Sequence, residues 1–322
     1  MKLGFVVIGR NEGDRLVDCL TSISKTGCPV VYVDSGSADR SVANADGLGA
    51  QIVELDMATP FTAARARNAG MKALLSARPD VMFIHFIDGD CALSPNWLDK
   101  GYDFISSRPD VAIACGRRQE RFPDASVYNN LCQREWTQSV GETTACGGDA
   151  IARVEALQQV GGFRESLIAG EEPELCVRLR KKGWRIWRLD AVMTLHDAAM
   201  SRFAQWWRRM IRGGHAFGEV SRLHFRSAKG IWIRETVRAL VWGLVLPLVI
   251  IMLGLANPLL FAGFLVYPLQ IARIAAREGW SSMDSWKFAV LMTLAKFAEA
   301  YGIVRYYLLM VFRSRSGIIE YK

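Results

Sequence analysis

One stretch decides the fold of this chain: Phe83-Ile84-His85-Phe86-Ile87-Asp88-Gly89-Asp90. A short and almost uniformly apolar run is typical of a strand that is covered on both faces of a parallel sheet. Here the run ends in two carboxylates on a tight turn, with a glycine between them. Because ligands bind beyond the carboxyl ends of such strands, we expect Asp88 and Asp90 to face a ligand.

Strands and helices alternate around this stretch. Short apolar runs predict strands over Leu3–Ile8, Val30–Val33, Gln51–Leu55, Val81–Ile87 and Val111–Ala114. Amphipathic patterns predict helices over Asp14–Ser24, Thr62–Ala77 and Trp97–Ser107. Further along, we expect a helix over Pro173–Lys182 and a strand over Trp184–Leu189. This alternation predicts a doubly wound α/β sheet.

Polar residues follow three of the predicted strands. They are Asn11-Glu12, Asp34-Ser35-Gly36-Ser37 and Asp88-Gly89-Asp90. We expect the three loops to converge on one crevice. Each loop also has a structural interpretation, since Asp34 can close an Asx turn and Asp14 can cap a helix.

The same residues indicate how a nucleotide would be held. The chain has no G-x-G-x-x-G or Walker-type loop after the first strand, which argues against a dehydrogenase or an NTPase. A D-x-D pair also occurs in ordinary turns, but carboxylates are preferred ligands of Mg²⁺ and Mn²⁺, which bind diphosphates. We therefore expect a Mn²⁺ or Mg²⁺ cofactor.

Charge and cysteine content limit the possible partners and the compartment of the protein. Among 322 residues, 40 Lys and Arg against 32 Asp and Glu give a formal net charge of +8. Such an excess suits anionic lipid or phosphate-bearing substrates, and without a recognisable nucleic-acid-binding motif we expect no nucleic acid partner. The seven cysteines have no paired spacing, which indicates reduced thiols. The apolar run at the N-terminus is too short for a signal peptide, so we expect residues 1–200 in the cytosol.

The composition changes from about Thr236. Ala239–Ala256 and Leu259–Ala272 are uncharged, and Asn257-Pro258 separates them. Basic residues flank the pair but not the turn, which is the positive-inside pattern of a membrane hairpin. A helical hairpin buried in a soluble protein is the alternative. We expect amphipathic interfacial helices over 201–235 and a region bound to the inner or plasma membrane over 236–322.

The segment Trp286–Phe312 is apolar but interrupted by charges. These are Lys287, Lys296, Glu299 and Arg305, followed by a basic tail with Arg313, Arg315 and Lys322. Charges inside a bilayer are costly, and a third crossing would put the tail on the wrong side. We therefore favour a helix in or against the cytosolic interface over a third span.

Together these residues resemble the inverting family 2 glycosyltransferases of the GT-A fold. The matching motifs extend over roughly residues 1–215: Val7-Ile8-Gly9-Arg10-Asn11-Glu12, Val33-Asp34-Ser35-Gly36-Ser37-Ala38-Asp39, Ala66-Arg67-Asn68-Ala69-Gly70, Ile87-Asp88-Gly89-Asp90, Gly147-Gly148-Asp149 and Gly170-Glu171-Glu172-Pro173-Glu174-Leu175. The resemblance implies a GT-A-like mixed sheet in residues 1–200, a nucleotide-sugar donor, most often UDP-linked, and a lipid-linked or glycan acceptor.

The resemblance also implies roles for single residues. It implies that Asp90 binds the metal. It also implies that nine residues contact the nucleotide or the donor sugar: Asn11, Glu12, Asp34, Ser35, Gly36, Arg67, Asp88, Gly148 and Asp149. His196, expected in a loop, is a further candidate metal ligand, although a lone histidine is more often structural.

A carboxylate near the acceptor is the candidate base. A hydroxyl is a poor nucleophile at neutral pH, and a carboxylate within hydrogen-bond reach can take its proton. The family uses the Asp of a Gly-Glu-Asp motif, and Glu172 stands at that position here, so the base is Glu172 or its neighbour Glu171. Alternatively, these acids only stabilise the start of a helix.

The run Gln205-Trp206-Trp207-Arg208-Arg209 resembles the Q-x-x-R-W motif of membrane-bound family members. The resemblance implies that Gln205, Arg208 and Arg209 lie near the acceptor and the diphosphate, although Arg209 replaces the family's tryptophan. An amphipathic interfacial helix is the alternative interpretation.

Two other functions compete with sugar transfer. A nucleotidyltransferase that makes the nucleotide sugar also uses an α/β sheet and a metal. Such an enzyme is expected to have a basic glycine-rich loop after the first strand, which this sequence lacks, and no membrane hairpin. A non-catalytic membrane scaffold could retain the fold. An oligomer is compatible with each of these readings.

Overall fold

The computed structural model describes residues Met1–Phe312, and the basic tail with Arg313, Arg315 and Lys322 lies outside the described residues. The chain divides into two compact units. The first comprises Met1–Pro123 and Cys132–Ala199, and the second comprises Asp124–Leu131 and the chain from Met200 onward. One boundary between the units lies within helix α5, Val127–Trp136, and the others follow Pro123 and Ala199.

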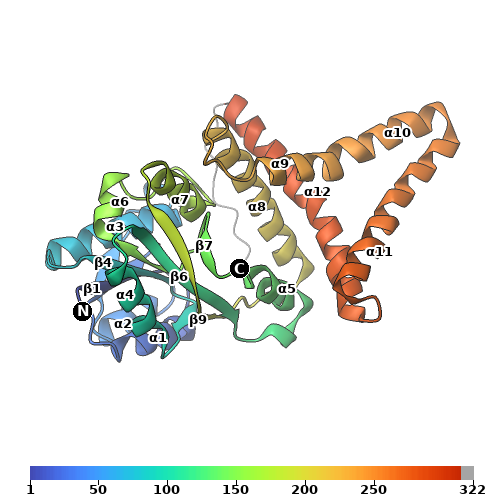
Figure 1. Ribbon diagram of the computed structural model, residues 1–322. Coiled ribbons are helices and arrows are strands. Elements are labelled where there is room, and N and C mark those ends of the chain that lie inside the picture. Colours follow the sequence, from blue (N-terminus) through green and yellow to red (C-terminus); the bar gives the residue numbers. More distant parts are fainter. Residues whose placement is uncertain (313–322) are drawn as a thin grey trace. The chain divides into compact units, whose positions relative to one another are not determined.

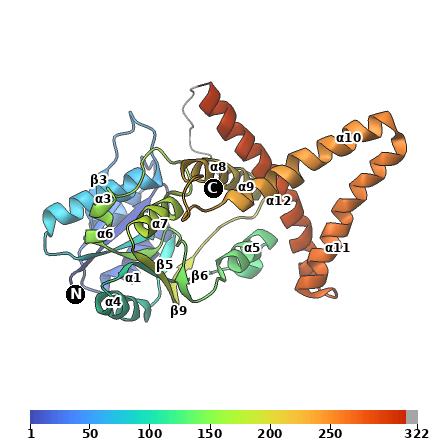
Figure 2. The same ribbon diagram turned by 45° about the horizontal axis from the view of Figure 1, so that its top comes forward.

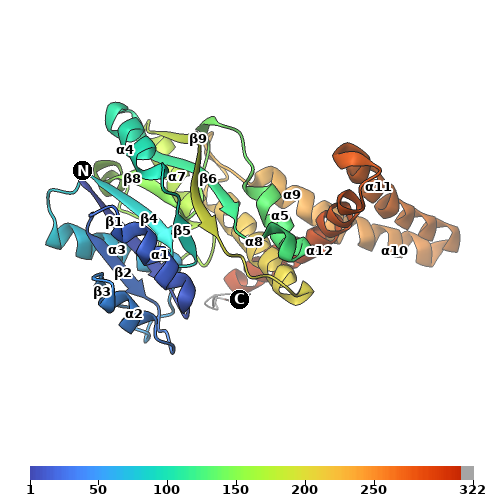
Figure 3. The same ribbon diagram turned by 90° about the horizontal axis from the view of Figure 1, so that it is seen from below.

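A nine-stranded mixed sheet forms the centre of the first unit (Figure 1). Its path is β3-β2-β1-β4-β8-β6-β9-β5, and β7 also pairs with β9. The strands are β1 Leu3–Gly9, β2 Val30–Asp34, β3 Gln51–Glu54, β4 Phe83–Asp88, β5 Cys91–Leu93, β6 Val111–Glu120, β7 Gly141–Thr143, β8 Ala150–Arg153 and β9 Arg185–His196. Strands β3, β2, β1 and β4 are parallel neighbours, as Figure 3 shows, whereas β8 runs antiparallel between β4 and β6.

Helices cover both faces of this sheet. Figures 1 and 2 show α3, α6 and α7 on one side and α1, α2 and α4 on the other. Their bounds are α1 Asp14–Ser24, α2 Ser41–Gly47, α3 Ala63–Ala77, α4 Trp97–Ser107, α6 Val154–Gln159 and α7 Glu171–Lys181. The doubly wound fold predicted from the alternating pattern is therefore confirmed.

His85, the polar residue within the apolar run before Asp88, belongs to the core. Its ring stacks on Phe5 with 5.1 Å between centroids, and its Nε2 accepts a hydrogen bond from Trp97 Nε1 at 2.8 Å. Burial lowers the pKa of His85 to about 4, so the ring stays neutral and can accept this bond. Strand β4 is thereby fixed in the centre of the sheet.

Several predicted boundaries were wrong. Helix α7 begins at Glu171 rather than Pro173, because Gly170 adopts the left-handed conformation (φ 79°) that starts the helix two residues earlier. Strand β9 runs on to His196, so His196 ends a strand and does not lie in a loop. Strand β6 likewise continues past Ala114, and Gly13, not Asp14, precedes the first helix as its cap.

The second unit is helical. Its elements after α5 are α8 Phe203–Leu223, α9 Ile233–Leu240, a π-helical turn Val241–Val245, α10 Leu246–Ala256, a 3-10 helix Pro258–Leu265, α11 Val266–Gly279 and α12 Met283–Val311. Glycines let helices approach closely here. A Cβ on Gly214 of α8 would overlap the backbone of Glu299, and a Cβ on Gly302 of α12 would overlap that of Ile211. Helices α8 and α12 therefore pack backbone to backbone.

Two helical stretches of this unit, Ile233–Ala256 and Pro258–Gly279, are long and apolar enough to cross a membrane. They meet at a turn, which Figure 2 shows between α10 and α11. There Asn257 Oδ1 accepts a hydrogen bond from the Leu259 amide. Large apolar side chains on both are exposed, with Leu255 72% and Leu259 80% accessible. A hairpin buried in the core of this chain would cover these side chains, and within the described residues they are not covered.

Helix α12 carries its charges partly inside the protein. Lys296 and Glu299 form an ion pair one turn apart, and both side chains are largely buried. This pairing lowers the cost of the two charges in an apolar helix. Whether α12 lies at the interface or crosses a membrane stays a prediction.

A glycine in α3 offers a test of the packing in the first unit. A Cβ on Gly70 would overlap Val6 and lie 2.8 Å from Val33 Cγ2, so α3 sits directly on β1 and β2. We expect Gly70→Ala to destabilise the unit by about 1–3 kcal/mol. The thermal midpoint should fall by several degrees, at about 2–4 °C per kcal/mol.

The matched control is Gly47→Ala, where nothing lies within 4 Å of the added methyl group. That variant should keep or slightly raise the midpoint, since alanine favours a helix over glycine. An unchanged midpoint in Gly70→Ala would show that α3 packs more loosely than described.

Candidate active site

The three polar loops meet at one edge of the sheet. Residue Ile8 of β1 pairs with Asp88 of β4, and Gly9 pairs with Asp34 of β2. The Gly89 amide donates to Ile8 O at 2.8 Å, which ties the loop after β4 to the end of β1. Parallel register thus brings the strand ends together, as expected from the sequence.

Asp34 organises its own loop. Its Oδ1 accepts a hydrogen bond from the Tyr32 hydroxyl at 2.9 Å, and its Oδ2 accepts from the amides of Gly36 and Ser37 at 2.9 and 2.7 Å. The side chain is buried. This is the Asx-turn role weighed from the sequence, and it fixes the backbone at Gly36 and Ser37.

The loop after β1 is joined to that after β2. Asn11 has a positive φ of 55°, which asparagine tolerates better than most residues. Its amide donates to Ser37 Oγ at 2.9 Å, and its Oδ1 accepts from the Ala38 amide at 2.7 Å. Glu12 forms an ion pair with Arg15 at 2.8 Å.

Arg67 on α3 is the hub of the site. Its guanidinium is 2% exposed and contacts three carboxylates that are distant in sequence. Nη2 lies 2.8 Å from Asp88 Oδ1, and Nη1 lies 2.8 Å from Glu171 Oε1 and 2.9 Å from Glu172 Oε1. The structure thereby brings the end of β4 and the start of α7 to one point.

The charges around Arg67 shift its pKa and that of Glu172. Burial by itself would lower the pKa of Arg67, but the charges of Glu172, Asp88 and Glu171 outweigh it and raise the pKa. Burial and then the charge of Glu171 raise the pKa of Glu172 to about 7, against the opposing effect of Arg67. Glu172 can therefore both hold and release a proton near neutral pH.

The side chains of Glu171 and Glu172 differ in their exposure to solvent. Glu171 is 5% exposed at its side chain and Glu172 is 16% exposed. A bound molecule could reach Glu172 more readily, whereas Glu171 mainly fixes Arg67. The structure thus distinguishes two residues that the sequence left equivalent.

Arg118 on β6 is a site residue that the sequence reasoning missed. Its Nη2 lies 3.1 Å from Asp88 Oδ2 and 2.9 Å from Asp149 Oδ1, and its guanidinium lies over the ring of Trp136 at 5.5 Å. Because the strand was predicted to end at Ala114, Arg118 was not placed near the sheet edge. The pair Arg117-Arg118 continuing an apolar strand was the available signal.

Asp149 and Gly148 complete this part of the site. Asp149 is buried, and it accepts hydrogen bonds from the Asp88 amide at 3.1 Å and from Thr194 Oγ1 at 2.6 Å. A Cβ on Gly148 would lie 2.5 Å from Arg67 Nη2 and 2.8 Å from Asp88 Oδ2. Only glycine leaves the Arg67–Asp88 pair undisturbed.

Asp90 and His196 lie side by side, with 3.3 Å between Asp90 Oδ2 and His196 Nε2. Together with Cys91 they offer ligand atoms within 4.8 Å of one another. Burial lowers the pKa of His196, so its ring is neutral and can donate a lone pair. Burial raises the pKa of Cys91, which keeps the thiol protonated. An oxygen and a nitrogen ligand therefore remain for a divalent ion.

The three residues of the Q-x-x-R-W-like run belong to the second unit. Gln205 Oε1 accepts hydrogen bonds from the amides of Ser201 and Arg202, both at 3.0 Å, and so caps helix α8. Their closeness to the acceptor and diphosphate, with Arg208 and Arg209, stays a prediction.

Comparison with known proteins identifies the family of this site. The family model of glycosyl transferase family 2 matches residues 5–161. A relative, glycosyltransferase AglE of Haloferax volcanii, is 23% identical over 246 residues, which cover 70% of this chain and 73% of that protein.

Solved structures share the fold. The mannosyltransferase PcManGT from Pyrobaculum calidifontis, in complex with GDP-Man and Mn²⁺, is 16% identical with a TM-score of 0.63, covering 94% of this chain and 87% of that one. Glucosyl-3-phosphoglycerate synthase from Mycobacterium tuberculosis, in complex with Mg²⁺ and UDP, is 15% identical with a TM-score of 0.51, covering 68% and 78%. Both likenesses concern the fold alone.

These matches favour sugar transfer over the nucleotidyltransferase and scaffold readings. The matched range contains the hub Arg67 and the carboxylates at the ends of β2 and β4. Residues 5–161 of this chain therefore match a glycosyl transferase family 2 domain, and this domain lies on a GT-A-like sheet.

Proposed function

We propose that this chain is a membrane-attached, metal-dependent inverting glycosyltransferase. It would move a sugar from a nucleotide donor, expected to be a UDP-sugar, to a lipid-linked or membrane-proximal glycan acceptor at the cytosolic face. The observation that carries the proposal is the convergence of Asp88, Glu171 and Glu172 on Arg67 beyond the carboxyl ends of the strands. Its membrane part is supported by the exposed apolar helices of the second unit.

The residues present fit a divalent ion. A carboxylate oxygen of Asp90 and the neutral imidazole of His196 form a donor set that Mn²⁺ accepts, while the protonated thiol of Cys91 is a poor ligand for such an ion. Such an ion would stabilise negative charge on the diphosphate leaving group. Asp88, held by Arg67 and Arg118, would bind the donor sugar.

Glu172 is the base in this proposal. The acceptor hydroxyl oxygen attacks the anomeric carbon while the bond from that carbon to the diphosphate oxygen breaks. The hydroxyl proton passes to a carboxylate oxygen of Glu172. One displacement of this kind inverts the anomeric centre. Glu171 acts as a positioning residue, because it holds Arg67 beside Glu172.

Matched substitutions distinguish the roles of the two glutamates. We expect Glu172→Gln to lower transfer at least about a hundredfold, because an amide cannot take the proton. Nucleotide binding should stay intact. The measurement is transfer from a panel of UDP- and GDP-sugars with Mn²⁺, together with a binding isotherm for the nucleotide.

Glu171→Gln is the matched comparison, since it removes the same charge from the other contact of Arg67. It should reduce transfer less than Glu172→Gln does. The reverse order, or wild-type turnover in Glu172→Gln, would contradict the assignment. Pyrophosphate release from a nucleoside triphosphate would instead support a nucleotidyltransferase.

Substitution of Asp90 and His196 tests the proposed metal site. We expect Asp90→Asn and His196→Ala each to weaken Mn²⁺ binding at least about tenfold, as loss of a ligand does. Isothermal titration of Mn²⁺ into the UDP-bound protein measures this without an activity assay.

Cys91→Ser tests the third ligand atom in the group. Because the thiol is protonated, the variant should bind Mn²⁺ as the wild type does. Mn²⁺ affinity that survives in Asp90→Asn would place the metal elsewhere in the chain.

A further inference from the structure

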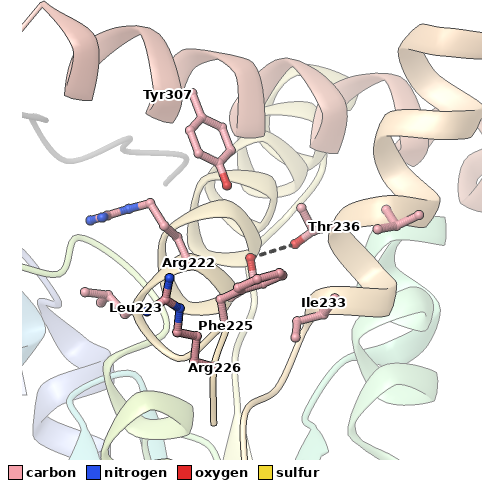
Figure 4. Close-up of a pocket in the computed structure, with 9 residues that line it drawn as sticks. Arg222, Leu223, Phe225, Arg226, Ile233, Thr236 and Tyr307 are labelled. Atoms are coloured by element: carbon pink, nitrogen blue, oxygen red, sulfur yellow. Dashed lines mark hydrogen bonds between the residues drawn. The ribbon is translucent and has the colours of Figure 1, made fainter.

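A second candidate binding site lies wholly within the helical unit. It is an open cavity of about 440 Å³ where the end of α8 meets the start of α9 and the last turns of α12 (Figure 4). Among the residues that line it are Ser221, Arg222, Phe225, Arg226, Thr236 and Val237. Helix α9 also begins the first stretch that is long enough to cross a membrane, Ile233–Ala256.

Two arginines give this cavity a positive charge. Arg222 donates from Nε to the Tyr306 hydroxyl, which fixes its guanidinium, and Arg226 also lines the cavity (Figure 4). No carboxylate pairs with either arginine among residues Met1–Phe312. The nearest acid along α8, Glu219, lies 3.3 Å from His215. The cavity therefore offers two guanidinium groups to an anion.

Two of the other polar groups that line the cavity are already engaged with each other. The hydroxyls of Ser221 and Thr236 lie 3.2 Å apart in a hydrogen bond, drawn as the dashed line in Figure 4. The carboxyl end of α8 and the amino end of α9 both border the cavity, so their opposite dipoles largely offset each other. The two arginines thus set the sign of the local potential.

One wall of the cavity is apolar and open. Phe225 is 68% exposed and Val237 is 54% exposed. Exposed apolar side chains continue from there along the candidate span, with Val241 41% and Val245 49% accessible. A ligand that suits this site carries a negative head for the arginines and an apolar chain for this wall.

We propose that this cavity binds the phosphate headgroup of a membrane lipid. The proposal rests on the membrane attachment in the proposed function, because the apolar wall continues into the candidate span. Guanidinium groups bind phosphate through paired hydrogen bonds, and the apolar wall lies where the lipid chain leaves the headgroup. An anionic phospholipid and a prenyl phosphate share this chemistry.

The test uses the full chain in neutral detergent with four soluble probes. They are a short-chain phosphatidic acid, the matched phosphatidylcholine, farnesyl phosphate and inorganic phosphate, and microscale thermophoresis gives each dissociation constant. We expect phosphatidic acid to bind at least about tenfold more tightly than phosphatidylcholine, whose choline offsets the phosphate charge. Arg226→Gln should weaken phosphatidic acid binding about tenfold.

The matched control is Arg277→Gln, which removes the same charge from an exposed position on α11 outside the cavity. It should change the dissociation constant less than about twofold, because a distant exposed charge is screened. Unchanged UDP binding in Arg226→Gln would show that the variant is folded.

The binding measurements can either support or overturn the proposed lipid-phosphate site. Tighter Arg226-dependent binding of farnesyl phosphate than of phosphatidic acid would support the site and identify a prenyl phosphate as its ligand. Equal binding of phosphatidic acid and phosphatidylcholine, equal losses in Arg226→Gln and Arg277→Gln, or equally tight binding of inorganic phosphate would overturn the proposal. Failure of the wild type to enter neutral phosphatidylcholine vesicles would instead contradict membrane attachment itself.

Discussion

A buried guanidinium holds together the carboxylates at one edge of the sheet. Arg67 is 2% exposed, and its positive charge would be costly in that position without the carboxylates of Asp88, Glu171 and Glu172. Those carboxylates likewise depend on Arg67, since like charges so close together would otherwise repel. The mutual dependence couples helix α3 to the end of β4 and to the start of α7. This ion cluster therefore sets the positions of the side chains at this edge of the sheet.

Arg118 extends the cluster on the far side of Asp88. Arginines and carboxylates alternate there, because Arg118 pairs with both Asp88 and Asp149. Asp88 is the more exposed of the two carboxylates, at 26%, and Asp149 is fully buried. The buried partner anchors the chain of charges, and the exposed one can meet a ligand. The raised pKa of Glu172 follows from its place at the other end, where burial and the charge of Glu171 outweigh Arg67.

Local sequence patterns predicted much of the fold and many of the candidate site residues. The features that they missed depend on packing between residues distant in sequence. The strand before Asp88 was recognisable because a buried parallel strand has a continuous apolar run, and the helix Asp14–Ser24 because its apolar stripe has helical spacing. Arg118 and the longer β9 escaped prediction because polar residues in these strands are stabilised by partners distant in sequence, such as Asp149 for Arg118. Glu171 and Glu172 could not be told apart from the sequence, because they differ in exposure, which depends on packing around the start of α7.

The pH dependence of kcat/KM for sugar transfer tests the central claim most directly. If Glu172 takes the acceptor proton in the field of Glu171 and Arg67, log kcat/KM should rise with unit slope at low pH and level off above about pH 7. The carboxylate must be ionised to act as a base, so activity is lost as pH falls below the raised pKa. A profile that stays flat from about pH 5 to 8 would contradict this account of the site.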